Sequence, residues 1–459
     1  TYVSAGVVTA EGIIPNNEYN RYNFTANHSS SFLDERMHLS VLGMYMNVNE
    51  QNMLSSGQYY NPMIPVYLMS PSDDIRKYAV YERYNASRNF PVQYWPWGSQ
   101  SLQMQNPYWI TNRNMFNTGK DRFLFGASLK YDVTDWLDIT GRARIDYTHI
   151  TAEQKNYAST LGLFAGDKGR YYNNTYITSQ RYADVLANFH KTFADGAFSL
   201  NATLGTSMMQ TRSNNVSLLY EQSKFVAPGN GGAYYPNIFN PSNFYKNGTT
   251  MGLERKRLNS VFGAVTFGFK EALFLDVTAR NDWSSALAYT DGYSFFYPSV
   301  GLSAVVSNMV NMPEWFTFLK VRGSYSKVAS AFARYLSNPA YSFNNQTHNW
   351  SKPSTYPAYN LKPEDTKSWE IGLNARFLNH INFDVTYYRS NTYHQTIYAP
   401  LPSSSGYNQV VVQAGDVQNQ GVELALGYNN KWNDFTWSSS YTFTLNRNEI
   451  CLLYTSDAA

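Results

Sequence analysis

Apolar and polar residues alternate along most of the chain, in segments of roughly ten residues that recur about fifteen times. In one such segment the apolar residues Trp369, Ile371 and Leu373 are interleaved with the polar residues Glu370 and Asn374. A period of two places all the apolar side chains on one face of a β-strand, whereas a helix would scatter them. The pattern therefore predicts an all-β protein with few helices, in which each strand has an apolar and a polar face.

Three further segments show the same alternation, at 137–146, 381–387 and 435–445. The typical segment of roughly ten residues matches the roughly 9 to 11 residues of a tilted membrane strand. No apolar run approaches the roughly 18 residues of a membrane-spanning helix, so a helical membrane protein is excluded. A transmembrane antiparallel β-barrel remains, because its strands are apolar only at alternate positions and its mean hydropathy, here -0.44, resembles that of a soluble protein.

The expected connections alternate between short and long. Short turns follow every second strand, at 134–136, 194–196 and 378–380. Long loops lie between them, at about 49–120, 151–170, 211–250 and 329–360. Short turns at one end and long loops at the other are typical of outer-membrane barrels. A soluble sandwich would instead have few loops beyond roughly 12 to 15 residues.

Charged residues within the strands fall on the polar positions, which would line the lumen of a barrel. The candidate lumen-lining residues are Arg142, Arg144, Asp146, Arg280, Glu370, Arg376, Asp384 and Glu423. The apolar positions, among them Ile371, Leu373, Ile381 and Phe383, would then face lipid. Aromatic residues cluster near strand ends, as interfacial girdles do, although tyrosine and phenylalanine favour strands in any protein.

Composition narrows the class further. The chain has 459 residues, of which 43% are hydrophobic and 15% charged, so it is not disordered. Its net charge of +3 is too small to indicate nucleic acid as a partner. The single cysteine, Cys451, excludes a disulfide framework. It lies in a segment, 450–459, that abandons the alternation, so we expect a folded domain at 1–449 followed by a non-native tail.

No residue pattern indicates an enzyme, a metal site or a cofactor. Ser324 and Lys327 have the S-x-x-K spacing of penicillin-binding enzymes, but that chemistry needs the two residues one helical turn apart, and here they lie in an alternating strand. The seven histidines lack the H-x-H and H-E-x-x-H spacings of metal ligands. We therefore expect a protein that is not an enzyme and has no metal or cofactor.

Aromatic residues in two of the long loops are candidates for contact with a substrate or a partner. They are Trp95, Trp97, Tyr108 and Trp109 in the first loop and Tyr234 and Tyr235 in a later one. Exposed rings offer flat apolar faces that stack on sugars or fill pockets of a partner protein. The alternative is that these rings pack a large loop against its neighbours.

Several blocks of the sequence, in order, resemble the barrel signature of the SusC/RagA family of TonB-linked outer-membrane transporters. The blocks are 279–301, 319–328, LKPEDTKSWEIGL at 361–373, DVTYYRSNT at 384–392 and AGDVQNQGVEL at 414–424. The resemblance implies a barrel of roughly twenty-two strands with an N-terminal plug. It also implies a location in the bacterial outer membrane and opening by the TonB energy-coupling complex through an N-terminal box. A surface lipoprotein of the SusD type would cap such a barrel.

This sequence shows no plug or coupling box, so we expect about fifteen strands of a larger barrel. The function implied is active import of oligomeric nutrients, with a glycan preferred over a peptide as ligand. The alternative is a passive porin or a structural surface barrel without energy coupling. Composition and periodicity alone do not separate these two functions.

Overall fold

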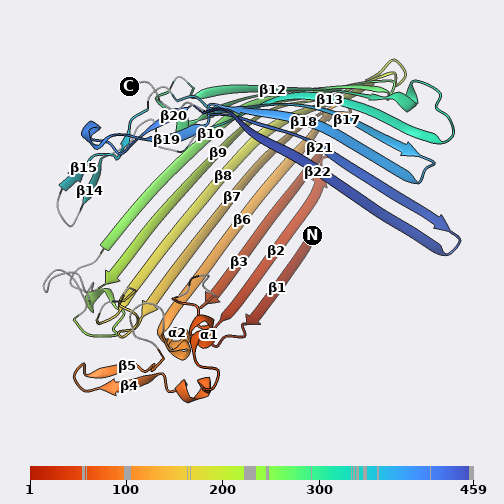
Figure 1. The fold of residues 1–459 in the computed structure, drawn as a ribbon. Helices are drawn as coiled ribbons and strands as arrows, with labels where there is room; N and C mark the ends of the chain where they lie inside the picture. Colours follow the sequence, from red (N-terminus) through yellow and green to blue (C-terminus); the bar gives the residue numbers. More distant parts are fainter. Residues whose placement is uncertain are drawn as a thin grey trace.

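The computed structural model describes residues 1–453 apart from 54–56, 58, 98–104, 163, 166, 222–233, 244–247, 291, 332, 334, 335, 337–340, 345–348, 359, 360 and 414. Its main feature is one antiparallel sheet of 15 strands (Figure 1). In chain order these strands are β1 (Tyr2–Glu11), β2 (Glu18–Phe32), β3 (Met37–Gln51), β6 (Asn114–Thr134), β7 (Leu137–Asn156), β8 (Arg170–Phe193), β9 (Phe198–Glu221), β10 (Gly248–Phe269), β11 (Leu273–Ser284), β12 (Ser294–Val305), β13 (Phe316–Ser330), β17 (Glu364–Phe377), β18 (Ile381–Tyr393), β21 (Gly415–Trp432) and β22 (Phe435–Leu453).

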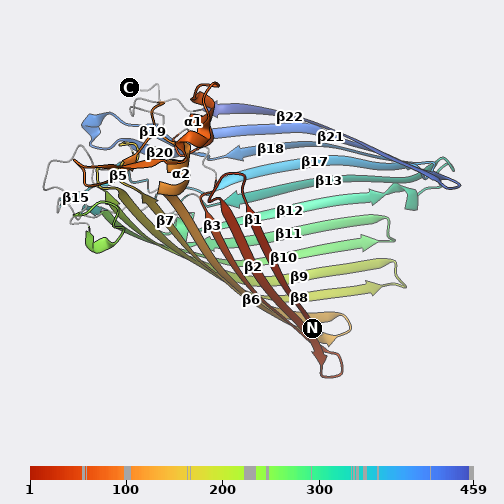
Figure 2. The same cartoon turned by 90° about the horizontal axis from the view of Figure 1, so that it is seen from below.

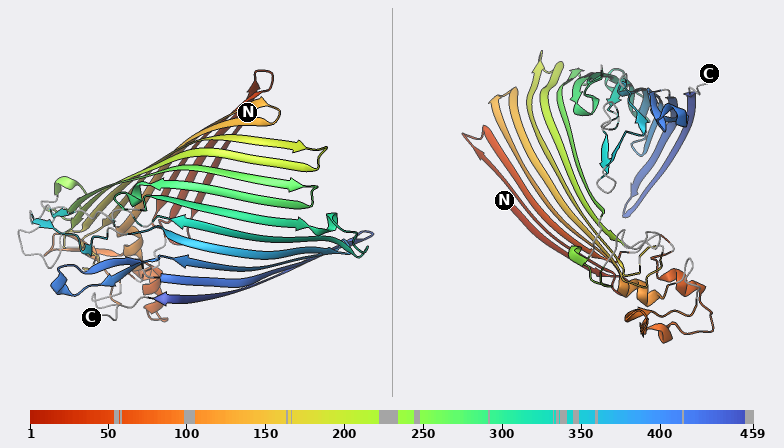
Figure 3. Two further views of the ribbon diagram at one scale, coloured as in Figure 1. Left: turned by 90° about the horizontal axis from the view of Figure 1, so that it is seen from above. Right: turned by 90° about the vertical axis from the view of Figure 1, so that its left-hand side faces the viewer.

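Each strand of this sheet pairs with the next one along the chain, from β1 at one edge to β22 at the other. The all-β fold and the number of strands predicted from the periodicity are thereby confirmed. Among the described residues no ladder joins the two edge strands. The sheet curves strongly but remains open between β1 and β22 (Figure 3).

The strands are longer than the roughly ten residues that the periodicity predicted. β8 and β9 have 24 residues each, and such a strand spans roughly 80 Å before tilt. The apolar band of an outer-membrane barrel is only about 25 Å tall, so these strands continue well beyond it. The predicted loop 211–250 is wrong in extent for this reason: β9 continues to Glu221 and β10 begins at Gly248. Both faces are polar there, which hides the period of two.

The connections differ between the two ends of the sheet, as predicted (Figure 2). At the turn end, Ala194, Asp195, Leu378 and Asn379 have positive φ, as tight hairpin turns require. The loop end carries α1 (Met63–Leu68), η1 (Ile75–Tyr78), β4 (Glu82–Asn85), β5 (Phe90–Gln93), α2 (Pro107–Arg113), η2 (Pro241–Asn243), η3 (Ser285–Leu287), β14 (Ser342–Asn344), β15 (Asn349–Ser351), β16 (Thr355–Tyr356), β19 (Thr396–Pro400), η5 (Ser403–Ser405) and β20 (Gln409–Gln413). The remaining short helix, η4 (Val306–Asn308), follows β12 at the turn end.

No helix in the described part of the chain is long and apolar enough to cross a membrane.

The ladders keep apolar residues together on one face of the sheet and polar residues on the other. In the β17–β18 ladder Leu373 lies opposite Val385, whereas Asn374, one position further on, lies opposite Asp384. The apolar face is open to solvent in the isolated chain, and the side chain of Ile371 is 57% exposed. The predicted division of the strands into an apolar and a polar face is therefore the observed one. The predicted boundary at residue 450 does not coincide with a strand end, because β22 continues to Leu453, and residues 454–459 lie outside the described part.

Candidate functional site: the loop end and the polar face

One buried asparagine, Asn106, holds together the long loop between β3 and β6. Its side-chain amide donates to the carbonyl oxygens of Tyr78 (2.9 Å) and Tyr94 (3.0 Å), and its Oδ1 accepts the backbone N–H of Tyr108 (2.8 Å). Its own backbone N–H donates to Oε1 of Gln93 (2.7 Å). These four hydrogen bonds fix η1, β5 and the start of α2 relative to one another.

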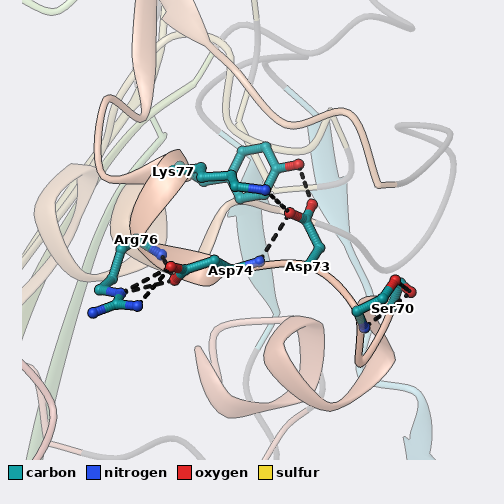
Figure 4. A network of polar contacts seen from close by, with 7 residues as sticks. Ser70, Asp73, Asp74, Arg76 and Lys77 are labelled. Atoms are coloured by element: carbon teal, nitrogen blue, oxygen red, sulfur yellow. Dashed lines mark hydrogen bonds and ion pairs between the residues drawn. The ribbon is translucent and has the colours of Figure 1, made fainter.

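A network of exposed polar contacts shapes the segment around η1 in the same loop (Figure 4). Asp73 accepts hydrogen bonds from the hydroxyl of Tyr78 and from Nζ of Lys77 (2.9 Å), and these donors lower the pKa of Asp73 to about 2. Asp74 accepts the backbone N–H of Arg76 (2.9 Å) and pairs with its guanidinium (2.7 Å). The network therefore fixes the shape of η1 at the surface.

The predicted aromatic residues of this loop lie at different depths. Trp109 on α2 is 1% exposed, and its indole N–H donates to the hydroxyl of Thr160 (3.0 Å). Trp95 is half-buried and packs edge-on against a tyrosine of η1, with ring centroids 5.2 Å apart. Trp97 and Tyr108 are half-buried as well. Trp109 thus has the packing role that was the alternative interpretation, because α2 turns its ring into the interior of the loop.

Tyr234 and Tyr235 are the most exposed of the predicted aromatic residues, at 54% and 66%. Their backbone is held by Asn243, which is 6% exposed. The side chain of Asn243 accepts the N–H of Tyr235 (2.9 Å) and donates to the carbonyl oxygens of Tyr235 (2.8 Å) and Ile238 (2.9 Å). The carbonyl oxygen of Asn243 accepts the N–H of Tyr234 (2.7 Å). Two exposed rings therefore project from a fixed backbone, and we call residues 234–243 the tyrosine segment.

The tyrosine segment is also joined to the loop between β7 and β8. Nζ of Lys168 donates to the carbonyl oxygen of Tyr234 (2.9 Å). The side chain of Asn237 accepts the backbone N–H of Ala158 (2.6 Å), and its own N–H donates to the carbonyl oxygen of Lys168 (3.1 Å). These bonds tie two long loops into one assembly at the loop end.

Four of the predicted lumen-lining residues belong to ion pairs on the polar face of the sheet. The pairs are Arg122–Asp146, Arg142–Asp184, Arg280–Asp282 and Arg322–Asp384. In the second pair the side chain of Asp184 is completely buried, and Arg142 binds it through Nε (2.9 Å) and a terminal nitrogen (2.7 Å). Such a bidentate contact fixes the orientation of both side chains.

The other four predicted residues, Arg144, Glu370, Arg376 and Glu423, lie on the same polar face and are exposed. Nε of Arg376 donates to the side chain of Asn382 (2.9 Å). The structure thus places all eight predicted residues on one face, but each of the four ion pairs joins one of them to a residue outside the predicted set.

Sequence reasoning did not single out several residues that organise this region. Asp184, Asp282 and Arg322 occupy polar positions of alternating strands, but their pairing depends on the ladder register, which the periodicity does not give. Asn106 had a local signal, since it precedes Pro107 and an asparagine followed by a proline is a helix start. No comparable signal marks Asn243.

The geometry gives no support to the catalytic motif. Ser324 and Lys327 lie three positions apart on β13, so their side chains point to opposite faces of the sheet. No cluster of three or more histidine, cysteine, aspartate or glutamate side chains suited to a metal ion occurs among the residues that the structure describes.

Comparison with known proteins places these features in context. The chain is similar to the TonB-dependent receptor P3 of Formosa agariphila, with 24% identity over 82% of this chain and 37% of that protein. It is also similar to the TonB-dependent receptor SusC of Bacteroides thetaiotaomicron, with 22% identity over 99% of this chain and 46% of that protein. The chain thus spans less than half the length of these curated relatives.

Solved structures agree on the fold. The RagAB peptide importer in its closed-closed state matches with a TM-score of 0.77 and 19% identity, over 99% of this chain and 49% of that one. The siderophore receptor PiuA from Acinetobacter baumannii matches with a TM-score of 0.54. The predicted resemblance to SusC and RagA is confirmed, and the location is the bacterial outer membrane. Residues 65–458 match the family described as TonB dependent receptor-like, beta-barrel, and the chain belongs to that family.

Proposed function

We propose that this chain forms part of the barrel of an energy-coupled transporter that imports oligomeric nutrients across the outer membrane. The observation that carries the proposal is the tyrosine segment, whose backbone is fixed at the loop end of the sheet. One face of this sheet is polar and carries the ion pairs. A membrane barrel pairs every backbone group and can enclose a polar lumen. In this proposal Arg142, Arg280, Glu370 and Asp384 line that lumen, and the loop end faces the cell exterior.

The partners follow from the same proposal. A barrel of roughly twenty-two strands encloses a lumen wide enough to require a plug. A plugged lumen must be opened by work done from inside the cell. We therefore infer coupling to the TonB complex and capping by a surface lipoprotein of the SusD type. Contact with this lipoprotein would involve the loop end, where the long loops gather (Figure 2).

We infer that the ligand is a glycan. The rings of Tyr234 and Tyr235 are exposed on a backbone fixed by Asn243, which suits stacking on sugar rings. Trp95 and Trp97, both half-buried, would extend this surface. A peptide is the second candidate, because RagAB, which has a similar fold, is a peptide importer. A peptide would add strand-like backbone pairing to the loops.

The test is growth of a strain carrying the full-length gene on single oligosaccharides or on peptides as the limiting nutrient. Tyr234→Ala with Tyr235→Ala should slow uptake of the ligand at limiting concentration. Tyr67→Ala, which removes an even more exposed ring (80%) from α1, is the control. Normal uptake by the double variant would assign both tyrosines to other roles. Uptake that persists after deletion of the energy-coupling complex would instead support a passive porin.

A further inference from the structure

Four arginines form a cluster on the apolar face of the sheet. They are Arg181 on β8, Arg212 on β9, and Arg255 and Arg257 on β10. The ladders place Arg181 opposite Gln210, Gln210 opposite Arg257, and Arg212 opposite Arg255. All four arginines are exposed. Since paired strands lie about 4.8 Å apart, the cluster covers three strands and roughly 10 Å. We call it the arginine patch.

The arginine patch is costly for the isolated chain. Like charges directly opposite each other on one face of a ladder are destabilising, and Arg212 faces Arg255 in this way. Within the described part of the chain, no carboxylate forms an ion pair with any of the four arginines. Arg257 contacts only the sulfur of Met208 with its guanidinium (3.0 Å). Folding alone therefore gives no reason for this concentration of positive charge.

The patch adjoins the lipid-facing surface at the loop end. On the same face of the same strands, nearer the turns, Val185, Leu204 and Val261 are 51%, 64% and 46% exposed. Trp283 is 36% exposed and lies opposite Asn259. Asn259 is two residues from Arg257 and is therefore the next residue of β10 on this face. Tryptophan is enriched where a membrane protein passes from hydrocarbon to headgroups. If the loop end faces the cell exterior, as in the proposed function on which this inference rests, the arginines lie where the headgroups of the outer leaflet begin.

We propose that the arginine patch binds the phosphate groups of a phosphorylated lipid of the outer leaflet. Guanidinium groups bind phosphate oxygens in pairs, and an anion between Arg212 and Arg255 would remove their repulsion. The acyl chains of the same lipid would lie along Val185, Leu204 and Val261. A second copy of this chain is a poor occupant, since two such patches repel each other. β8, β9 and β10 lie inside the strand order, so neighbouring strands flank the patch without covering it.

The test uses the full-length protein in neutral detergent and measures its thermal unfolding during titration with bisphosphorylated lipid A. Parallel titrations use the dephosphorylated lipid and inorganic phosphate. The lipid with phosphates should raise the melting temperature at the lowest concentration. Arg212→Gln with Arg255→Gln should weaken this effect about tenfold or more, because hydrogen bonds between charged groups are lost. Lys191→Gln, at the turn end of β8, removes an equal charge and should leave the titration unchanged.

A second double variant, Arg181→Gln with Arg257→Gln, repeats the measurement if the first does not fold. Equal responses of wild type and both patch variants would overturn the proposal. So would equal stabilisation by the dephosphorylated lipid, which would assign binding to the acyl chains alone. Equal stabilisation by inorganic phosphate at the same concentration would replace the lipid with a free anion and would also contradict the proposal.

Discussion

Arginines on the two faces of this sheet have opposite surroundings. On the polar face Arg142, Arg280 and Arg322 each pair with an aspartate of the same chain, at distances of 2.7 to 3.0 Å. On the apolar face Arg212 and Arg255 lie opposite each other, and the described residues offer them no carboxylate. Arg142, Arg280 and Arg322 are neutralised when the sheet forms. The outer ones require a counter-charge from the surroundings, which is the difference between a structural ion pair and a binding surface.

The largest expected effect comes from placing an arginine on the wrong face. Leu373→Arg puts a charge in the middle of the lipid-facing surface and should lower the free energy of unfolding by about 2 to 4 kcal/mol. Asn374→Arg, one position along β17, points to the polar face and is the control. Unfolding of the full-length protein by urea in lipid vesicles measures both. Equal tolerance of the two substitutions would contradict the assignment of the faces.

A smaller effect is expected from opening an inner ion pair. Asp184→Asn leaves Arg142 without its carboxylate and should lower the free energy of unfolding by about 2 kcal/mol, since Arg142 is still partly solvated. Asp276→Asn removes a carboxylate from the same face and should change the free energy by less than about 0.5 kcal/mol. If adding Arg142→Gln to Asp184→Asn restored no stability, the pair would not be the cause.

The outer arginines should respond in the opposite direction when lipid is absent. Arg212→Gln relieves the repulsion with Arg255 and should raise the free energy of unfolding in neutral detergent by about 0.5 kcal/mol. Lys191→Gln on the same outer face should give no gain. Chemical unfolding of purified full-length protein decides the sign. A loss of stability in detergent would mean that Arg212 has a favourable contact within the protein.

The smallest effect concerns an ion pair at the surface of the first long loop, between Asp73 and Lys77. The pKa of Asp73, about 2, is below its ordinary value of 3.8, so its contribution is complete above about pH 3.8 and lost as the pH falls through about 2. Pepsin should therefore cleave near η1 faster at pH 2 than at pH 4. Asp73→Asn should show the faster cleavage at both values. Pepsin cleavage at a site outside this loop provides the reference rate.

The sequence was sufficient for the features that depend on a period of two. The face of Leu373, the face of Arg142 and the number of strands all follow from alternation, because successive residues of a strand point to opposite sides. The length of β9 did not follow, since Ser213, Asn214 and Asn215 are polar on both faces while the backbone ladder continues. The alternation of apolar and polar residues stops where the apolar face of β9 stops, whereas the strand itself continues beyond that point.

The loop residues were harder to place from the sequence for a different reason. Trp109 and Tyr235 are both aromatic residues in long loops, yet one is 1% and the other 66% exposed. The difference arises from α2, which turns Trp109 inward, and from Asn243, which fixes the backbone of Tyr235. Hydrogen bonds across the loop determine this geometry, and the alternation of apolar and polar residues does not report them.

The linear strand order has a consequence for the assembly of the protein. Because each strand pairs only with its neighbours in the strand order, the sheet can grow one hairpin at a time. Long loops interrupt this order at several points, such as the connections from β3 to β6, from β13 to β17 and from β18 to β21. Closing a long flexible loop costs only about 0.6 kcal/mol more for each doubling of its length. The long loops can therefore be enlarged with little penalty to the folding of the strands beneath them.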